Sequence, residues 1–270
     1  MSNPTLEARY TEVRQRVAEA AARSGRSPES VYLVAVTKYA EPEDIWDLIE
    51  LGHQDFGESR VQQLVQRATM LDERLARLRQ RPKAARGGAS AASAVAEAGL
   101  RWHMIGHLQK NKARKVVELC RLVHSVDSLR LAEELQQLAG KREGEIDVLV
   151  QVNILGEESK TGCPLPAAEA LCDQIDSMIG VRVRGLMTMA PETDDPEQAR
   201  SVFRRCRELF EEIAKTGVGE GAFNILSMGM SGDYEIAIEE GSNIVRVGSA
   251  IFGNTLREPE TVNASEAPSG

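Results

Sequence analysis

Eight short apolar runs recur along the chain, and nearly every one is followed by a stretch with helical periodicity. Runs that are apolar throughout are typical of parallel strands whose two faces are both covered by helices. Eight strand–helix units within about 250 residues match the size of a closed (β/α)8 barrel, which is the α/β fold we predict. The runs are VYLVAVT, HQDFG, RWHMIG, RLVHSV, IDVLVQVNI, VRVRGLMTM, AFNILSMG and NIVRVGS.

An open, doubly wound sheet is the competing arrangement of the same elements. Such a sheet usually has a G-x-G-x-x-G turn directly after its first strand. Here that turn reads TKYAEP and contains no glycine. The sequence therefore favours a single TIM-like barrel.

Three segments lie outside the repeating pattern. Residues 5–23 read as an amphipathic helix ahead of the first strand, so we expect one extra N-terminal helix. Residues 81–99 consist mainly of Ala, Gly and Ser without apolar periodicity, which indicates a low-complexity insertion forming a surface loop. Residues 258–270 have the composition of a disordered tail. The barrel domain is therefore expected to span residues 1–257.

Charge and composition narrow the classes of partner. A net charge of −8 argues against binding to nucleic acid or to an anionic membrane surface. No apolar run approaches the ~20 residues of a membrane-spanning helix, and the N-terminus does not resemble a signal peptide, so we expect a cytoplasmic protein. The four cysteines form no C-x-x-C pair and have no histidine at ligand spacing, so no metal site is expected.

Lys38 follows directly on the apolar run of the first predicted strand. In a (β/α)8 barrel the functional residues gather at the C-terminal ends of the strands, so we expect this lysine to face the barrel mouth. Partial desolvation favours the neutral amine, which can form a Schiff base with a carbonyl compound. The carbonyl could belong to a sugar phosphate, as in an aldolase, or to pyridoxal 5′-phosphate.

Two loops rich in glycine and serine, one after each of the last two predicted strands, supply an anion site. Barrels commonly bind phosphate in these loops, because glycine lets backbone N–H groups approach an anion closely. The residues concerned are Gly229, Gly232 and Gly248, with hydroxyl groups from Ser227, Ser231 and Ser249. Arg246 lies within the last strand, where it either pairs with a carboxylate of a neighbouring strand or donates a hydrogen bond to a ligand.

Eight segments together resemble the pyridoxal phosphate homeostasis protein family, in the same order and at similar spacing from about residue 5 to 253. They are AVTK, FGES, WHMIGHLQKNK, HSVDS, VQVNILGEESKTG, GLMTMAP, LSMGMSGDYEIAI and VRVGSAIFG. The resemblance implies the barrel of pyridoxal-phosphate fold type III, as in the N-terminal domain of alanine racemase. It also implies a protein that binds pyridoxal 5′-phosphate and takes part in vitamin B6 homeostasis with little or no catalytic turnover.

The resemblance assigns roles residue by residue. Lys38 matches the Schiff-base lysine, and Arg246 matches the arginine that faces the pyridine nitrogen. Gly248 and Ser249 match a phosphate-binding Gly-Thr pair, with serine keeping the hydroxyl group. Ser231 matches a phosphate-side serine.

The same comparison places Ser227 and Met228 in the loop that lines the phosphate. Two positions depart from the family pattern. Ser59 stands where the family has an asparagine beside the cofactor, and Arg60 replaces a tyrosine. The insertion at 81–99 is also unusual.

Three functions are compatible with these residues: a cofactor-binding regulator, an amino-acid racemase dependent on pyridoxal phosphate, and a Schiff-base aldolase. Arg246 favours the first, because a guanidinium cannot accept a proton from the pyridine nitrogen and so does not keep the ring protonated. Candidate partners are pyridoxal-phosphate-dependent apo-enzymes, and we expect a monomer or weak dimer. We interpret His103 and His107 as structural residues.

Overall fold

The computed structural model describes residues 4–80, 90–157, 160–193 and 195–253. Its strands are all parallel and follow the order β4-β3-β2-β1-β9-β8-β7-β5-β6, and a further pairing between β4 and β5 closes the ring. The predicted eight-stranded barrel is therefore confirmed, and β6 is a two-residue addition beside β5. The strands are β1 Tyr32–Val36, β2 Asp55–Glu58, β3 Arg101–Met104, β4 Cys120–Val126, β5 Ile146–Asn153, β6 Cys163–Pro164, β7 Val181–Met187, β8 Ile225–Ser227 and β9 Ile244–Val247.

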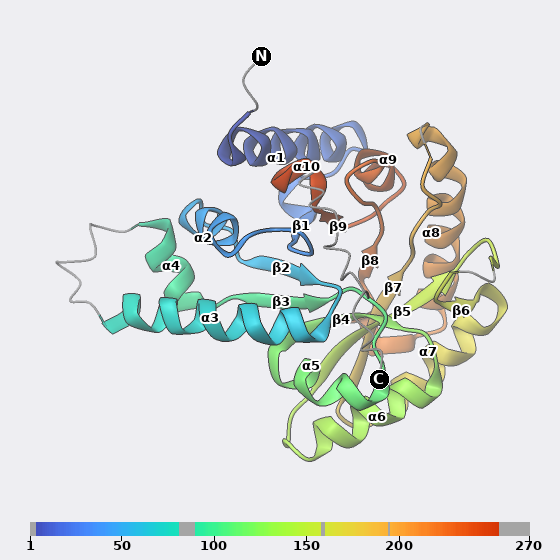
Figure 1. Ribbon diagram of the computed structural model, residues 1–270. Coiled ribbons are helices and arrows are strands. Elements are labelled where there is room, and N and C mark those ends of the chain that lie inside the picture. The colour runs from blue at the N-terminus through green and yellow to red at the C-terminus, as the bar shows by residue number, and fades with distance from the viewer. Residues whose placement is uncertain (1–3, 81–89, 158–159, 194, 254–270) are drawn as a thin grey trace, which may run out of the picture.

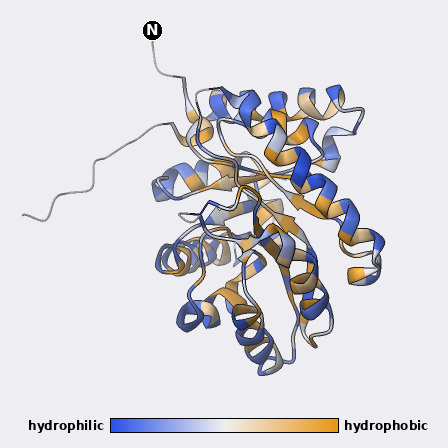
Figure 2. Ribbon diagram, turned by 90° about the vertical axis from the view of Figure 1, so that its right-hand side faces the viewer, coloured by the Kyte–Doolittle hydropathy of each residue, from blue (hydrophilic) through white to orange (hydrophobic). Residues whose placement is uncertain are grey.

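Helices surround the barrel on its outside (Figure 1). Each connection between neighbouring barrel strands contains at least one helix, as parallel strands require. The helices are α1 Leu6–Arg23, α2 Pro42–Glu50, α3 Val61–Gln80, α4 Ala91–Ala98, α5 Ala113–Leu119, α6 Leu129–Gly140, α7 Ala168–Asp176, α8 Arg200–Lys215, α9 Tyr234–Glu239 and α10 Ser249–Phe252. Figure 2 shows the hydrophobic strands in the interior and the hydrophilic faces of the helices directed outwards.

The core has two parts because alternate residues of a strand point to opposite faces. The larger part joins the outer face of the strands to the buried faces of the helices and runs from Tyr10 to Phe252. The smaller part fills the inside of the barrel and consists of Val34, Leu122, Leu149, Met187 and Ile244. The inner row of β1 therefore continues from Val34 through Val36 towards Lys38.

The first and the last strand of the barrel lie side by side. Residues Tyr32 to Ala35 of β1 pair with Ile244 to Val247 of β9. This pairing brings the loop after β1 next to the loop after β9, so that residues more than 200 positions apart in the sequence meet at one end of the barrel.

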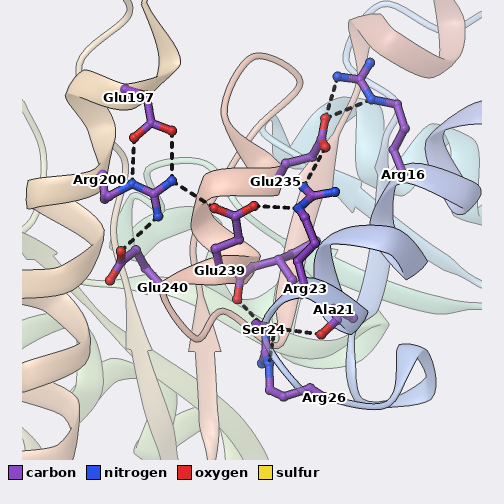
Figure 3. Close-up of polar contacts among 11 residues, drawn as sticks. Arg16, Ala21, Arg23, Ser24, Arg26, Glu197, Arg200, Glu235, Glu239 and Glu240 are labelled. Atoms are coloured by element: carbon purple, nitrogen blue, oxygen red, sulfur yellow. Dashed lines mark hydrogen bonds and ion pairs between the residues drawn. The ribbon is translucent and has the colours of Figure 1, made fainter.

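The expected N-terminal helix is confirmed as α1, which starts after the N-cap residue Thr5. Figure 3 shows how ion pairs join it to α9: Arg16 and Arg23 both contact Glu235, at 2.5 and 3.0 Å. Arg9 donates from Nε to the carbonyl oxygen of Ile251, at 2.7 Å. Helix α1 therefore covers the elements that flank β9.

The expectation of a surface loop is wrong for the second half of residues 81–99. Ser90 caps a helix there, α4, by accepting a hydrogen bond from the backbone N–H of Ser93. Alanine has the highest helix propensity, and Ala92, Val95 and Ala96 share one buried face of α4 that packs in the main core. This alanine-rich stretch thus forms a helix that packs in the main core.

Some expectations concern residues that the structure does not describe. The proposed tail at 258–270 and the segment 81–89 lie outside the described residues. Among the described helices, none has the length and apolar character needed to cross a bilayer. The described residues also contain no group of three or more His, Cys, Asp or Glu side chains placed to hold a metal ion.

Candidate cofactor-binding site

Lys38 lies in the turn after β1, two residues beyond the end of the strand, and its side chain is half-buried. Its Nζ atom is 4.7 Å from the centre of the exposed Tyr39 ring. The side chain lines a cavity of about 440 Å³ that the β1–α2 loop forms with α3. The lining of this cavity does not include Ser231, Arg246 or Gly248.

A buried ion pair holds the backbone on both sides of Lys38. The carboxylate of Glu58 is fully buried and contacts the guanidinium of Arg67. Glu58 Oε1 accepts a hydrogen bond from the Thr37 hydroxyl at 2.6 Å, and Arg67 Nη2 donates to the carbonyl oxygen of Ala40 at 2.7 Å. Burial lowers the pKa of Arg67 below its ordinary value. The pair therefore anchors the residues on both sides of Lys38.

The loops after β8 and β9 meet at Ser231. Its Oγ accepts hydrogen bonds from the backbone N–H groups of Gly248 and Ala250, at 3.1 and 3.3 Å. The backbone N–H of Arg246 donates to the carbonyl oxygen of Gly229 at 3.0 Å, which keeps the two loops together. Two N–H groups thus already converge on one oxygen atom at the place where the sequence predicts an anion.

Glycine is required at two points of this loop pair. Gly229 has a φ of +91°, and a Cβ there would lie 2.6 Å from the Ala237 Cβ atom. A Cβ at Gly248 would lie 3.2 Å from the carbonyl oxygen of Val36, at the end of β1. A side chain at position 229 would clash with α9, and one at position 248 would press on the end of β1.

Arg246 projects from β9 into the barrel and is 3 % exposed. Its Nη1 donates to Ser227 Oγ at 2.6 Å and its Nη2 donates to the carbonyl oxygen of Thr188 at 3.0 Å. Desolvation lowers its pKa to about 10, so the group stays cationic at neutral pH. Among the described residues no carboxylate lies within ion-pair distance of it, which contradicts the interpretation of Arg246 as half of a salt bridge between strands.

Ser227 is the last residue of β8, and Met228 is the first residue of the loop that follows it. Ser227 is fully buried inside the barrel, below the loops, where it bonds Arg246 and His124. The Met228 side chain is fully buried in the main core. Ser227 therefore reaches the site through Arg246, and the Met228 side chain is separated from it.

The remaining predicted residues fall into two groups. Ser231, Gly248 and the exposed Ser249, which is the first residue of α10, lie together at the paired loops. Ser59 is half-buried, and its backbone N–H donates a hydrogen bond to Glu58 Oε2 at 3.2 Å. Within the described residues, no hydrogen bond or ion pair joins Lys38 to Ser231 or Gly248. Sequence reasoning missed Glu58 and Arg67, although a carboxylate at the end of an apolar strand was a signal available in FGES.

With this geometry in place, comparison with known proteins is informative. Residues 10–255 match the family model described as alanine racemase, N-terminal domain. The pyridoxal phosphate homeostasis protein of Aquifex aeolicus is 34 % identical over 249 residues, covering 91 % of this chain and 96 % of that protein. This chain belongs to the pyridoxal phosphate homeostasis protein family. Its relative of the same name in Escherichia coli K12 is 35 % identical over 243 residues, covering 90 % of this chain and 93 % of that protein.

Solved structures agree with this assignment. PipY from Synechococcus elongatus, in a structure with pyridoxal phosphate bound, is 32 % identical, has a TM-score of 0.68, and covers 88 % of this chain and 100 % of that chain. Alanine racemase from Corynebacterium glutamicum shares the fold, with a TM-score of 0.60 at 14 % identity, and covers 89 % of this chain and 60 % of that chain. The family member described here therefore has the fold expected from its sequence.

The donor set fits pyridoxal 5′-phosphate, which carries a phosphate, a pyridine nitrogen that accepts hydrogen bonds, and an aldehyde. The backbone N–H groups of Gly248 and Ala250, with the Ser231 hydroxyl, match an anionic oxygen. The two hydrogen bonds of Arg246 use two of the five N–H groups of a guanidinium, which leaves donors for an acceptor atom. Lys38 supplies the amine.

Proposed function

We propose that this protein binds pyridoxal 5′-phosphate at the C-terminal end of the barrel and takes part in cellular vitamin B6 homeostasis. The observation that carries this proposal is the convergence of the Gly248 and Ala250 N–H groups on the Ser231 hydroxyl, on the same pair of strands as the buried Arg246. The names of the relatives and the cofactor bound to PipY support the same ligand for this chain.

Each residue then has one task. Ser231, Gly248 and Ser249 bind the phosphate, and Arg246 donates a hydrogen bond to the pyridine nitrogen. Lys38 is the point of covalent attachment, because bound pyridoxal phosphate supplies an aldehyde that reacts with a primary amine. The Glu58–Arg67 pair holds the β1–α2 turn that carries Lys38.

Little or no catalytic turnover is part of the proposal. A pyridoxal-phosphate enzyme that needs a strong electron sink pairs the pyridine nitrogen with an acidic residue, which keeps the ring protonated. Arg246 is cationic and donates only, so the nitrogen it faces stays unprotonated. The racemase alternative is therefore not favoured. We infer that the protein stores the cofactor for apo-enzymes of the cytoplasm, acting there as a monomer or weak dimer.

The test is reduction with borohydride followed by mass spectrometry. Purified protein is mixed with pyridoxal 5′-phosphate, its absorbance spectrum is recorded before and after reduction, and the modified peptide is sequenced. We expect the adduct on Lys38. Lys38→Ala should lose the reducible absorbance band and keep weaker binding through the phosphate loops.

Lys110→Ala is the matched control, because Lys110 is partly exposed and forms a surface ion pair with Glu134. This variant should behave like the unsubstituted protein. An adduct on Lys110 or Lys160, or no adduct at all, would overturn the assignment of Lys38.

A further inference from the structure

An unbroken line of polar side chains crosses the inside of the barrel and ends at Arg246. Arg246 Nη1 bonds Ser227 Oγ at 2.6 Å, and Ser227 Oγ bonds His124 Nδ1 at 2.9 Å. The His124 Nε2 and His103 Nδ1 atoms are 2.9 Å apart, and His103 Nε2 lies 3.2 Å from Asp55 Oδ1. Asp55 is also bonded to Arg101, which is partly exposed.

This line bridges strands that are not neighbours in the sheet. His124 belongs to β4 and Ser227 to β8, and four strands separate them on one side of the ring and two on the other. The interior of such a barrel is normally filled by layers of branched apolar side chains. Buried polar groups cost stability unless every one of them is hydrogen-bonded, so a complete polar line inside an apolar interior needs a reason.

The two ends of the line fix the direction of its hydrogen bonds. Arg246 can only donate, so Ser227 Oγ accepts from it. The pKa of Asp55 is lowered by its hydrogen bonds to Arg101 and His103, despite the opposing effect of burial, so the ionised carboxylate can only accept. His103 Nε2 therefore carries a hydrogen and donates it to Asp55.

The direction of the hydrogen bonds in the middle of the line follows from the number of hydrogens on each ring. Burial lowers the pKa of His124 well below its ordinary value, and the nearby His103 and Arg246 act in the same direction, so this ring is neutral and has one N–H group. Among the described residues, the Ser227 hydroxyl has one partner besides Arg246, namely His124 Nδ1, so we direct its hydrogen to that atom. The ring hydrogen of His124 then lies on Nε2 and is directed to His103 Nδ1. Ser227, His124 and His103 then each accept one hydrogen bond and donate one along the line, which starts at Arg246 and ends at Asp55.

We propose that Ser227, His124 and His103 are positioning residues for Arg246, forming a one-directional hydrogen-bond line anchored on Asp55 that holds the guanidinium where it meets the ligand. This inference rests on the proposed function, because it concerns the arginine that would face the pyridine nitrogen. Arginine has a long, flexible stem. The serine hydroxyl on one side and the Thr188 carbonyl on the other restrain its plane before any ligand arrives.

The first test uses the ligand-free protein. With ¹⁵N-labelled histidine, the ring nitrogens of His124 are assigned by comparison with the His124→Phe variant, and their shifts are recorded at neutral pH. We expect hydrogen on Nε2 and none on Nδ1. Hydrogen on Nδ1, or on both nitrogens, would reverse the line at Ser227 and overturn the proposal.

The second test measures binding of pyridoxal 5′-phosphate by equilibrium dialysis. Ser227→Ala removes the acceptor of Arg246 Nη1, and loss of a hydrogen bond to a charged group corresponds to a roughly ten- to hundredfold weaker affinity. Ser242→Ala is the matched control, because Ser242 is equally buried but bonds only backbone groups beside β8 and β9. It should lower the melting temperature without this loss of affinity.

The two experiments separate this inference from the proposed function. If the unsubstituted protein binds no pyridoxal phosphate while His124 carries its hydrogen on Nε2, the proposed function fails and the line itself stands. If the protein binds the cofactor and Ser227→Ala binds as tightly as Ser242→Ala, Arg246 needs no support from the line and the positioning role is wrong.

Discussion

Substitution of Glu58 should disturb the candidate site strongly, although Glu58 itself would not contact the ligand. It is fully buried, and its partners are the Arg67 guanidinium, the Thr37 hydroxyl and the backbone N–H of Ser59. Removing one charge from a buried ion pair leaves the other unpaired, which costs about 3–5 kcal/mol. Glu58→Gln should therefore lower the free energy of unfolding by about 3 kcal/mol, measured by urea denaturation.

Glu43→Gln provides the comparison for this measurement. Glu43 pairs with Arg74 at 3.0 Å on the surface, where 77 % of the glutamate side chain is exposed. Surface pairs contribute about 0–1 kcal/mol, so this variant should lose less than about 1 kcal/mol. Equal losses in the two variants would mean that the pair with Arg67 is not formed in solution.

At the scale of single residues, the groups at strand ends could be predicted from the sequence, whereas those that interact across the barrel could not. Lys38, Ser231 and Gly248 follow predicted strands, so the rule for barrel active sites could locate them. His103 and His124 sit within strands, and their contact depends on which side chains face inwards and how the ring closes. The only available signal was a histidine inside an apolar run. The sequence suggested a structural role for His103, and in the structure its buried ring is hydrogen-bonded.

At the scale of elements, α4 shows that composition can mislead. Low complexity suggested a loop, yet alanine favours helices, and the small side chains at 92, 95 and 96 let α4 approach its neighbours closely. Strands and long helices were predictable because their apolar periodicity is strong. Helix α4 has a buried face of only a few small residues, so its period was hidden by the uniform composition.

A matched pair of substitutions tests the packing of α4. Ala96 is 1 % exposed, whereas Ala94 on the same helix is exposed. Ala96→Asp would bury a carboxylate without a partner and should cost at least about 2 kcal/mol, or about 4–8 °C in melting temperature. Ala94→Asp carries only the helix-propensity cost of about 0.5 kcal/mol. Similar melting temperatures for the two variants would show that α4 is not docked.

The contact between α1 and the barrel predicts a dependence of stability on pH. His53 is buried, with Nδ1 bonded to the Tyr10 hydroxyl at 3.1 Å and Nε2 bonded to the carbonyl oxygen of Asp55 at 2.8 Å. Burial lowers its pKa from 6.5 to about 4. Between these two values the unfolded chain binds a proton that the folded protein does not, so stability falls as the pH falls through this window.

His53→Gln should remove this part of the acid sensitivity. The loss attributable to His53 is about 3 kcal/mol between pH 6.5 and about 4, since one pKa unit corresponds to about 1.4 kcal/mol. Above pH 6.5 the group contributes no slope. Urea denaturation at several pH values should give a flatter profile for the variant in this window. Profiles of the same slope would show that His53 is accessible to protons in the folded protein.

At the scale of the whole molecule, one continuous core from Tyr10 to Phe252 predicts a single unfolding transition. Far-UV circular dichroism reports all helices, whereas the fluorescence of Trp46 and Trp102 reports α2 and β3. The two signals should change at the same urea concentration. Separate midpoints would mean that the barrel consists of two halves that unfold independently.

The pairing of β1 with β9 also has a consequence during protein synthesis. The first barrel strand to leave the ribosome pairs on one side with the last, so the nascent chain carries an unprotected edge at β1 until residues 244–247 have been made. Lys38 follows β1, and the loops that contain Ser231 and Gly248 follow β8 and β9, so the proposed site draws on both ends of the chain. The proposed site is therefore complete only in a finished chain, which leaves its ligand no part in the early stages of folding.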